Sequence, residues 1–343
     1  METETTNKPS AVLVIVAFAI IYIVWGSTYF FIQMAVHGFP PMLLGAFRFL
    51  IAGLLLLGWC QLKNDRIWIK KDILSAAVSG LLMLFTATGG IIWAEQSLPS
   101  AIVAIMVSAN PIWFVALDKG NWKENLSNKS TLAGLIIGFS GVILLFAEAI
   151  VKSFAGTFTL TQVIALAMVM LDPIAWSLGA LLSKKNTTNT PARVSSAWQM
   201  IIAGLAFVIA ALVHNEFNHF QISSVPASAW MALVYLILFG SIGAFSAYIW
   251  LLKVRSAVQV SSHSYVNPVV AVILGVLFAH ESISVLQLVG LLVILCSVLL
   301  INAKKYAFKK PKVKLDCLKG VQPESYPKSA KPSLSFDSSI MDS

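Results

Sequence analysis

Charged side chains are scarce in this sequence. Asp, Glu, Lys and Arg together make up 11% of its 343 residues, whereas a soluble domain contains roughly a quarter. Hydrophobic residues make up 58%, and the mean hydropathy is +0.82. So few polar groups cannot cover the surface of a soluble protein, and a disordered chain would need many more of them. The composition therefore predicts an integral membrane protein.

Cysteine and the common catalytic motifs are equally sparse. The three cysteines are Cys60, Cys296 and Cys317, and none falls in a loop that we expect to face outward, so neither a disulfide nor a metal site is expected. The chain has no Walker A loop and no nucleophile elbow, and no segment between its apolar runs is long enough for a soluble domain. We therefore expect no cofactor, and the sequence disfavours an enzyme, an ATP-driven pump and a sensor.

Long apolar runs, in contrast, fill most of the chain. Ten of them are long enough, or nearly so, to cross a hydrocarbon core of about 30 Å. They predict an all-α, polytopic protein with ten transmembrane helices. The first run is too long for a signal peptide, so we expect it to be retained as a helix. The ten runs are 11–33, 41–61, 73–94, 98–117, 131–148, 159–182, 195–213, 229–251, 258–279 and 285–302.

The basic residues indicate how these helices are oriented. Every Lys and Arg except Arg48 and Lys152 lies before the first run, after the last run, or around a loop that follows an even-numbered run. Because such loops face the cytoplasm, both termini are expected to be cytoplasmic in a cell (inner) membrane protein. This distribution also explains the basic pI near 9.4 without a nucleic-acid partner.

The segment 304–343 differs from the rest of the chain. It begins with a cluster of lysines and continues as a Ser/Pro/Lys-rich stretch, which predicts a basic, disordered cytoplasmic tail. Two interpretations of the lysines stay open. They act as a cytoplasmic retention signal for the last helix, or they contact anionic lipid headgroups.

The sequence also contains an internal repeat. Trp25 and Arg48 are 23 residues apart, as are Trp176 and Gln199, and Ile-Ala-Gly-Leu follows both pairs. Further matches, each offset by 157 residues, are Ile92-Trp93 with Ile249-Trp250, Asn110-Pro111 with Asn267-Pro268, and Glu124 with Glu281. The halves therefore cover 11–150 and 157–303, with five runs each. Because five is odd, we expect an inverted repeat, with the substrate site near the midplane between the halves.

Several short motifs in these halves carry a family resemblance. They are Trp25-Gly26-Ser27-Thr28-Tyr29-Phe30, Pro40-Pro41, Arg48-Phe49-Leu50, Phe239-Gly240-Ser241, Ala247-Tyr248 and Tyr265-Val266-Asn267-Pro268. Together they resemble the EamA-type transporters of the drug/metabolite transporter (DMT) superfamily, and in particular the YedA-like inner-membrane exporters. The resemblance implies ten helices in two inverted five-helix repeats around a central cavity. It also implies secondary export of small metabolites, amino acids or drugs by alternating access. Uptake of the same solutes is the alternative, because the coupling gradient sets the direction.

The run 258–279 is polar in its first half. Buried polar groups are costly in hydrocarbon, so one face of this helix should line a polar cavity. Asn267-Pro268 places a capping residue before a proline in mid-membrane, which predicts a kink or break. His263 has two interpretations, a proton relay or a hydrogen bond to a neighbouring helix.

Asp172 is a carboxylate about thirteen residues into a span and departs from the family pattern. Because Pro173 follows it, Asp172 is expected either to cap a half-helix or to bind a proton or a cationic substrate. Coupling of export to the proton gradient through Asp172 is our hypothesis.

Arg48 is the other charge within a predicted span. Its guanidinium is suited to a substrate carboxylate, to outward snorkelling, or to tying helices together, and its repeat partner Gln199 keeps the hydrogen bonding without the charge. We favour a structural or gating role. Trp25 and Trp176 lie near mid-span, where they are expected either to stack on a planar or cationic ligand or to pack in the core.

The candidate substrate-binding or coupling residues share a position within a predicted span or a family motif. They are Trp25, Arg48, Asn110, Asp172, Trp176, Gln199, Tyr248, His263, Tyr265 and Asn267. The expected partners are a small-molecule substrate and the lipid bilayer. The oligomeric state stays open, because Gly134-x-x-x-Gly138 suits helix packing both within a chain and between chains.

Overall fold

The computed structural model describes residues 10–98, 100–154, 156, 159–185, 190–279 and 284–306. Within these ranges every regular element is a helix. The chain divides into two compact units, residues 1–304 and 305–343, and the helical bundle belongs to the first. The tail expected at 304–343, with most of its lysines, lies outside the described residues beyond Tyr306.

Eleven helical elements make up the first half of the described chain. They are α1 (Ala11–Val36), α2 (Pro41–Leu62), α3 (Lys70–Gly80), η1 (Leu81–Thr88), α4 (Gly89–Ala94), α5 (Ser100–Val107), α6 (Asn110–Leu117), η2 (Lys119–Asn121), α7 (Trp122–Ser127), α8 (Lys129–Leu145) and α9 (Ala147–Phe154).

The described part of the second half continues in the same manner. Its elements are α10 (Leu160–Lys185), α11 (Ala192–Val213), α12 (Glu216–His219), η3 (Ile222–Ser224), α13 (Ala227–Tyr235), η4 (Leu236–Phe245), α14 (Ser246–Val254), α15 (Ala257–Ser261), α16 (His263–Ala279) and α17 (Val285–Tyr306).

Seven helices of the described chain are long and apolar enough to cross a membrane. They are Ala11–Val36, Pro41–Leu62, Lys70–Ala94, Leu160–Lys185, Ala192–Val213, Ala227–Val254 and Ala257–Leu274. The count becomes eight if Lys119–Ser127 and Lys129–Leu145, which meet at 92°, form one span. The predicted spans 98–117 and 285–302 are shorter as single helices, because α5 and α6 are separate and the apolar part of α17 is Val285–Ile301.

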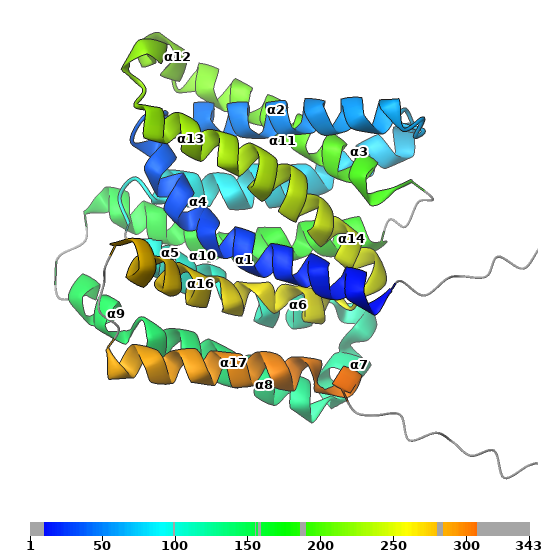
Figure 1. Ribbon diagram of the computed structural model, residues 1–343, viewed down its shortest axis with the longest axis vertical. Coiled ribbons are helices and arrows are strands. Elements are labelled where there is room, and N and C mark those ends of the chain that lie inside the picture. Colours follow the sequence, from blue (N-terminus) through cyan, green and yellow to red (C-terminus); the bar gives the residue numbers. More distant parts are fainter. Residues whose placement is uncertain are drawn as a thin grey trace, which may run out of the picture. The chain divides into compact units, whose positions relative to one another are not determined.

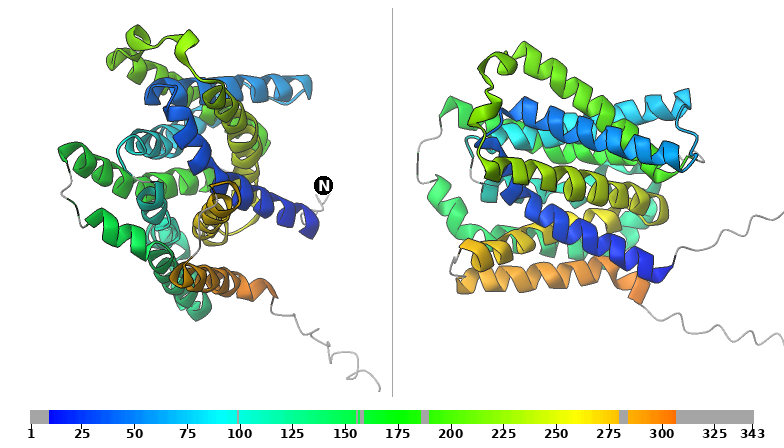
Figure 2. Two further views of the ribbon diagram at one scale, coloured as in Figure 1. Left: turned by 60° about the vertical axis from the view of Figure 1, so that its left-hand side comes forward. Right: turned by 45° about the horizontal axis from the view of Figure 1, so that its top comes forward.

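The first helix of each predicted half packs against the other half. α1 contacts α13, η4, α14 and α16, whereas α10 contacts α3, η1, α4 and α6. In Figures 1 and 2, α1 and α10 run in opposite directions. Figure 1 also shows that α1 begins on the side where α17 approaches its end, which we call the terminal face. Each half therefore supplies a helix to the other, and the bundle cannot be separated into two independent domains.

The two Ile-Ala-Gly-Leu motifs pack against each other where α2 crosses α11. A Cβ atom on Gly53 would lie 2.7 Å from the side chain of Ile201, and one on Gly204 would lie 2.8 Å from the backbone nitrogen of Leu50. Glycine is required at both places because the helices approach this closely. The repeated motif thus serves as a reciprocal contact between the halves.

The glycines of α8 serve packing within the chain. A Cβ atom on Gly134 would lie 3.0 Å from the backbone nitrogen of Ile301, and one on Gly138 would lie 2.6 Å from Ser297 Oγ and 2.7 Å from the ring of Tyr265. α17 and α16 therefore occupy the face of α8 that the small residues expose.

Two π-helical segments occupy equivalent places in the halves. η1 begins at Leu81 and η4 at Leu236, 155 residues later, and they end at Thr88 and Phe245, 157 residues apart. π-helical turns are rare and are often found at functional sites. In this protein each one interrupts an apolar helix at the level where the site residues described below converge.

The two Asn-Pro pairs differ in their effect on the backbone. Asn110-Pro111 opens α6 after a break at Ser108, but Pro268 lies inside α16. Of the kink or break expected at Asn267-Pro268, the break is therefore wrong. The described break falls at Ser262, between α15 and α16. Because Pro268 has no N–H, the carbonyl four residues earlier is free, and Ser108 Oγ donates to that Ser264 oxygen at 3.0 Å.

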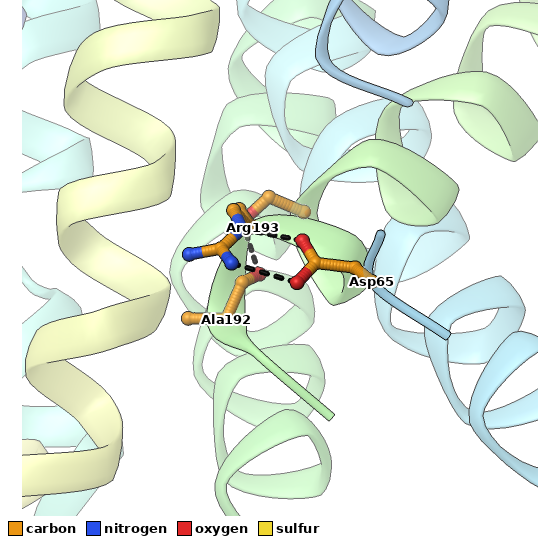
Figure 3. Close-up of polar contacts among 4 residues, drawn as sticks. Asp65, Ala192 and Arg193 are labelled. Carbon is orange, nitrogen blue, oxygen red and sulfur yellow. Dashed lines mark hydrogen bonds and ion pairs between the residues drawn. The ribbon is translucent and has the colours of Figure 1, made fainter. Parts of the chain in front are cut away.

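The terminal face is tied together by polar contacts from several helices. Arg193, at the start of α11, donates two hydrogen bonds to Asp65 in the loop after α2, at 2.5 and 2.7 Å (Figure 3). These bonds hold the pKa of the Asp65 carboxyl below its usual value. Lys184 of α10 donates to the carbonyls of Leu252 and Arg255 at the end of α14.

Candidate functional site

A cavity of about 70 Å³ lies where the two halves meet. Helices α1, α2, η1, α4, α5 and α6 form its wall from the first half, and α10, η4 and α16 form it from the second. Its polar and aromatic lining residues are Trp25, Thr28, Tyr29, Arg48, Phe49, Thr88, Asn110, Asp172, Trp176, Ser241, Phe245, His263 and Asn267. The site is thus assembled by segments that lie far apart in the sequence.

Most of the candidate residues come together in this cavity. Seven of the ten are in its wall: Trp25, Arg48, Asn110, Asp172, Trp176, His263 and Asn267. Tyr248 is fully buried, and its hydroxyl accepts a hydrogen bond from Trp176, which lines the cavity. Gln199 and Tyr265 are not among the described residues that line it.

Four aromatic rings pack together at the cavity, and three of them, Trp25, Trp176 and His263, line it. Trp25 meets Trp176 edge to face with centroids 5.4 Å apart, and it also contacts Tyr248 at 5.0 Å and His263 at 4.8 Å. The indole N–H groups are satisfied, because Trp25 donates to the Gly240 carbonyl at 3.1 Å and Trp176 donates to the Tyr248 hydroxyl at 2.9 Å. These bonds fix both indoles, so the cavity has a rigid aromatic wall.

Arg48 connects α2 to η4. Its Nε donates to Ser241 Oγ at 3.0 Å, and its guanidinium carbon lies 4.9 Å from the centre of the Phe49 ring. The side chain is buried, and its Nη1 has no hydrogen-bond partner among the described residues. Arg48 therefore ties two helices together while one donor group stays unused.

Asp172 lies inside α10 and does not cap a helix. α10 continues through Pro173, and both carboxylate oxygens of Asp172 lack a hydrogen-bond partner within the described chain. The capping interpretation is therefore wrong. Asp172 is 2% exposed and lines the cavity, so its unpaired oxygens belong to the site itself.

The side chains of Asn110 and Asn267 each contact a residue of α16. Asn110 Nδ2 donates to Ser264 Oγ at 3.4 Å, and Asn267 Nδ2 lies 3.4 Å from His263 Nδ1. His263 Nε2 and the side-chain oxygens of both asparagines lack partners in the described structure. The described bonds of His263 are thus to its own helix, and its second nitrogen is unused.

Gln199 and Tyr265 make contacts between helices. Gln199 Nε2 donates to Ser183 Oγ at 3.3 Å and to Ser195 Oγ at 3.0 Å. The Tyr265 hydroxyl donates to the Leu135 carbonyl at 2.9 Å, which links α16 to α8. Gln199 therefore does not repeat the position of Arg48 at the cavity, although the two occupy matching places in the sequence.

Several site residues carried no clear signal in the sequence. Thr28, Tyr29 and Ser241 line the cavity but were visible only as members of family motifs. Glu95 directly follows α4, is 6% exposed, and has two carboxylate oxygens without partners in the described residues. It interacts electrostatically with Arg48 and with Tyr29. A carboxylate at the end of a predicted span is ordinarily solvated, so the sequence alone does not indicate that Glu95 is buried.

A protein-family comparison matches the chain in two segments, one in each half. The EamA-like transporter family matches residues 11–147 and 163–303, which is most of the chain. This chain belongs to the EamA-like transporter family. The resemblance found in the sequence motifs is thereby confirmed, and membership places the chain in the DMT superfamily.

Individual relatives agree with this membership. The Escherichia coli K12 protein named "Uncharacterized inner membrane transporter YedA" is 33% identical over 290 residues, covering 84% of this chain and 90% of that protein. The Bacillus subtilis protein named "Uncharacterized transporter YvbV" is 26% identical over 85% of this chain and 92% of its own length. One crystal structure matches with a TM-score of 0.70 at 18% identity, over 87% of this chain and 100% of that one.

This EamA-like protein is therefore a membrane transporter with several membrane-spanning helices, and its family is one of transporters rather than enzymes. Within the described residues no group of three or more His, Cys, Asp or Glu side chains is arranged to hold a metal ion.

Proposed function

We propose that this protein is a secondary active transporter that exports small organic metabolites, amino acids or drugs by alternating access. The cavity supports the proposal most directly. It lies between the halves, it is lined by Trp25 and Trp176 from equivalent positions, and it contains buried polar atoms without described partners. Buried polar groups of this kind are costly unless water or a ligand satisfies them.

The proposed architecture has ten spans in two inverted repeats. The opposite directions of α1 and α10, and the reciprocal contacts of Gly53 and Gly204, support it. The crossings beyond the seven long helices would be α5 with α6, α8, and α17. Both termini are proposed to be cytoplasmic, on the basis of the positive residues, and the membrane is proposed to be the inner membrane by similarity to YedA.

Alternating access requires a closed end and an element that can bend. The polar contacts of Lys184 and Arg193 hold the terminal face together, and the π-helical segments η1 and η4 lie at the cavity in both halves. We propose that these segments flex as the terminal face opens and the opposite face closes.

Proton coupling through Asp172 is part of the proposal. Asp172 is buried and lines the cavity, whose other lining residues include Tyr29, Asn110 and His263. A proton that binds when the cavity faces one side and leaves on the other would drive export against a solute gradient.

The decisive experiment begins with an export or resistance screen in cells that lack their own exporters. Flux of the identified solute is then measured in proteoliposomes, with and without a proton gradient. We expect substrate-dependent counterflow that the gradient accelerates. Absence of counterflow for every solute found in the screen would contradict transport, and normal pH-dependent flux in Asp172→Asn would contradict coupling through this residue.

A further inference from the structure

An apolar groove lies at the bend between α7 and α8. Its volume is about 350 Å³, and α6, α7 and α8 form its walls. Every described side chain that lines it is hydrophobic, and none of these residues also lines the central cavity. Val115 and Leu135 are buried at its floor, whereas Ile136 is 69% exposed. The groove is therefore separate from the transport site and opens toward the surroundings of the bundle.

The short helix α7 lies across the end of α8, because the two helices meet at 92°. Figure 1 places it on the side of the terminal face. Trp122 and Leu126, four residues apart, share the face of α7 that lines the groove. Trp122 Nε1 donates to the Ala116 carbonyl at 3.1 Å, which fixes the indole against the last turn of α6. A tryptophan on an amphipathic helix at the end of a span is typical of the membrane interface.

Three exposed lysines lie beside the groove, and none forms an ion pair with another described residue. They are Lys119 before α7, Lys123 in α7 and Lys129 at the start of α8. The two nearby carboxylates do not neutralise them. Asp118 accepts hydrogen bonds from Asn121 and interacts electrostatically with Lys184. Glu124, two residues after Trp122, lies on the opposite side of α7 from the groove. The opening of the groove therefore has an excess of positive charge.

We propose that this groove is a binding site for an anionic phospholipid of the leaflet at the terminal face. One acyl chain lies in the groove, and the phosphate pairs with the three lysines. The volume of about 350 Å³ falls within the range of about 300–1,000 Å³ that is usual for sites of small organic molecules. Basic residues at the end of a membrane span attract anionic headgroups. The chain's own segment after Tyr306 suits the groove less well, because its lysines would be repelled by those beside it.

A photoreactive side chain in the groove identifies the occupant. p-Benzoylphenylalanine would replace the exposed Ile136 in the full-length protein, in nanodiscs with equal amounts of phosphatidylglycerol and phosphatidylcholine that have identical acyl chains. Mass spectrometry after irradiation identifies the adducts. We expect phosphatidylglycerol adducts to outnumber phosphatidylcholine adducts roughly tenfold, because the three lysines favour the anionic headgroup. The same replacement at Ile143, about two turns along the same face of α8 and outside the groove, should show no preference.

Three results of this experiment would overturn the proposal. Equal amounts of the two lipid adducts at Ile136, or the same preference at Ile143, would show that the groove does not select a lipid. An adduct to the segment after Tyr306, or a covalent dimer, would show that protein fills the groove instead. Because Ile136 is 69% exposed, its replacement should not disturb folding.

Charge variants of the photoreactive protein test the role of the lysines. The groove variant carries Lys119→Gln, Lys123→Gln and Lys129→Gln, and the preference for phosphatidylglycerol should disappear. The control carries Lys63→Gln, Lys70→Gln and Lys71→Gln, which make the same change of charge among exposed lysines around the loop before α3, and it should keep the preference. An equal loss of preference in both variants would show only a general attraction of anionic lipids and would overturn the site.

A steric variant tests the place of the acyl chain. Ala116 lines the groove, so Ala116→Phe should fill it with a ring and lower the yield of lipid adducts at Ile136 several-fold. Ala133→Phe makes the same change at an exposed position of α8 outside the groove and should leave the yield unchanged. Equal yields in the two variants would contradict an acyl chain in the groove.

Discussion

The indole rings of Trp25 and Trp176 meet edge to face, with their centroids 5.4 Å apart, although 151 residues separate them in the chain. The two tryptophans occupy matching places in the sequence pattern that predicts a repeat. Their contact joins α1 to α10, the first helices of the two halves of the chain. Both rings belong to the wall of the cavity.

The hydrogen bond between Trp176 and Tyr248 should be measurable as a coupling energy. Trp176 donates to the Tyr248 hydroxyl at 2.9 Å, and both side chains are buried. Trp176→Phe and Tyr248→Phe should each lower the free energy of unfolding, whereas the double variant should lose less than their sum. We expect a coupling of about 0.5–1.5 kcal/mol. Unfolding in detergent, followed by circular dichroism, would provide it, and strictly additive losses would argue against the bond.

The close approach of α2 and α11 predicts a contrast between two glycines of one helix. Gly53→Ala would place a methyl group 2.7 Å from Ile201, and we expect a loss of about 1–3 kcal/mol. Gly58, also in α2, has no described atom within 4 Å of the position of a Cβ atom. Gly58→Ala should therefore raise stability by about 0.5–1 kcal/mol through helix propensity. Thermal unfolding of both variants gives the comparison, and equal effects would refute the packing argument.

The sequence alone was sufficient to predict the family and several residues that the structure brings together. Matching spacings paired Trp25 with Trp176 and Asn110 with Asn267, and all four line the cavity. Family membership is confirmed. Residue types at fixed spacings are visible without coordinates, which is why these features could be predicted.

Other features depend on three-dimensional neighbours and were not accessible from the sequence. A kink or break was expected at Asn267-Pro268, but Ser108, from the turn between α5 and α6, satisfies the carbonyl that proline frees, and α16 continues. Asp172 has the local pattern of a cap, yet its carboxylate faces the cavity. Glu95 looked like a helix-end carboxylate until tertiary packing buried it near Arg48. Local patterns cannot reveal which neighbour another helix supplies.

The capping box of Ser284 and Gln287 is a motif for which the opposite holds. Ser284 N–H donates to Gln287 Oε1 at 2.9 Å, and Gln287 N–H donates to Ser284 Oγ at 3.2 Å. Both partners lie within one turn of the chain, so the sequence contains everything that the motif needs.

The pair of Asp65 and Arg193 predicts an acid-dependent contribution to stability. Its hydrogen bonds lower the pKa of Asp65 in the folded protein, so the contribution is present above the unfolded pKa, near 3.9, and is lost as the pH falls through the folded pKa. We expect less than about 1 kcal/mol, because the Arg193 side chain is 43% exposed and an exposed pair is screened by solvent.

Asp65→Asn should remove this dependence. Wild type and variant should differ in thermal midpoint at pH 7 and converge as the pH falls through the lowered pKa of Asp65 in the folded protein. Glu124→Gln, which alters an exposed carboxylate on α7, provides the control. A difference that stays constant or grows as the pH falls would show that the ion pair is not its cause.

The role of Arg48 can be resolved by changing each end of its bond to Ser241. Arg48→Lys keeps the positive charge but cannot reproduce the Nε donor at 3.0 Å, whereas Ser241→Ala removes the acceptor and keeps the guanidinium. If Arg48 ties α2 to η4, both variants should lower the unfolding midpoint and the maximal flux by similar amounts, with about 1 kcal/mol lost in each. The KM for the transported solute should stay unchanged. A raised KM in Arg48→Lys that Ser241→Ala does not share would instead indicate that the guanidinium binds the solute, because only the first variant removes the guanidinium.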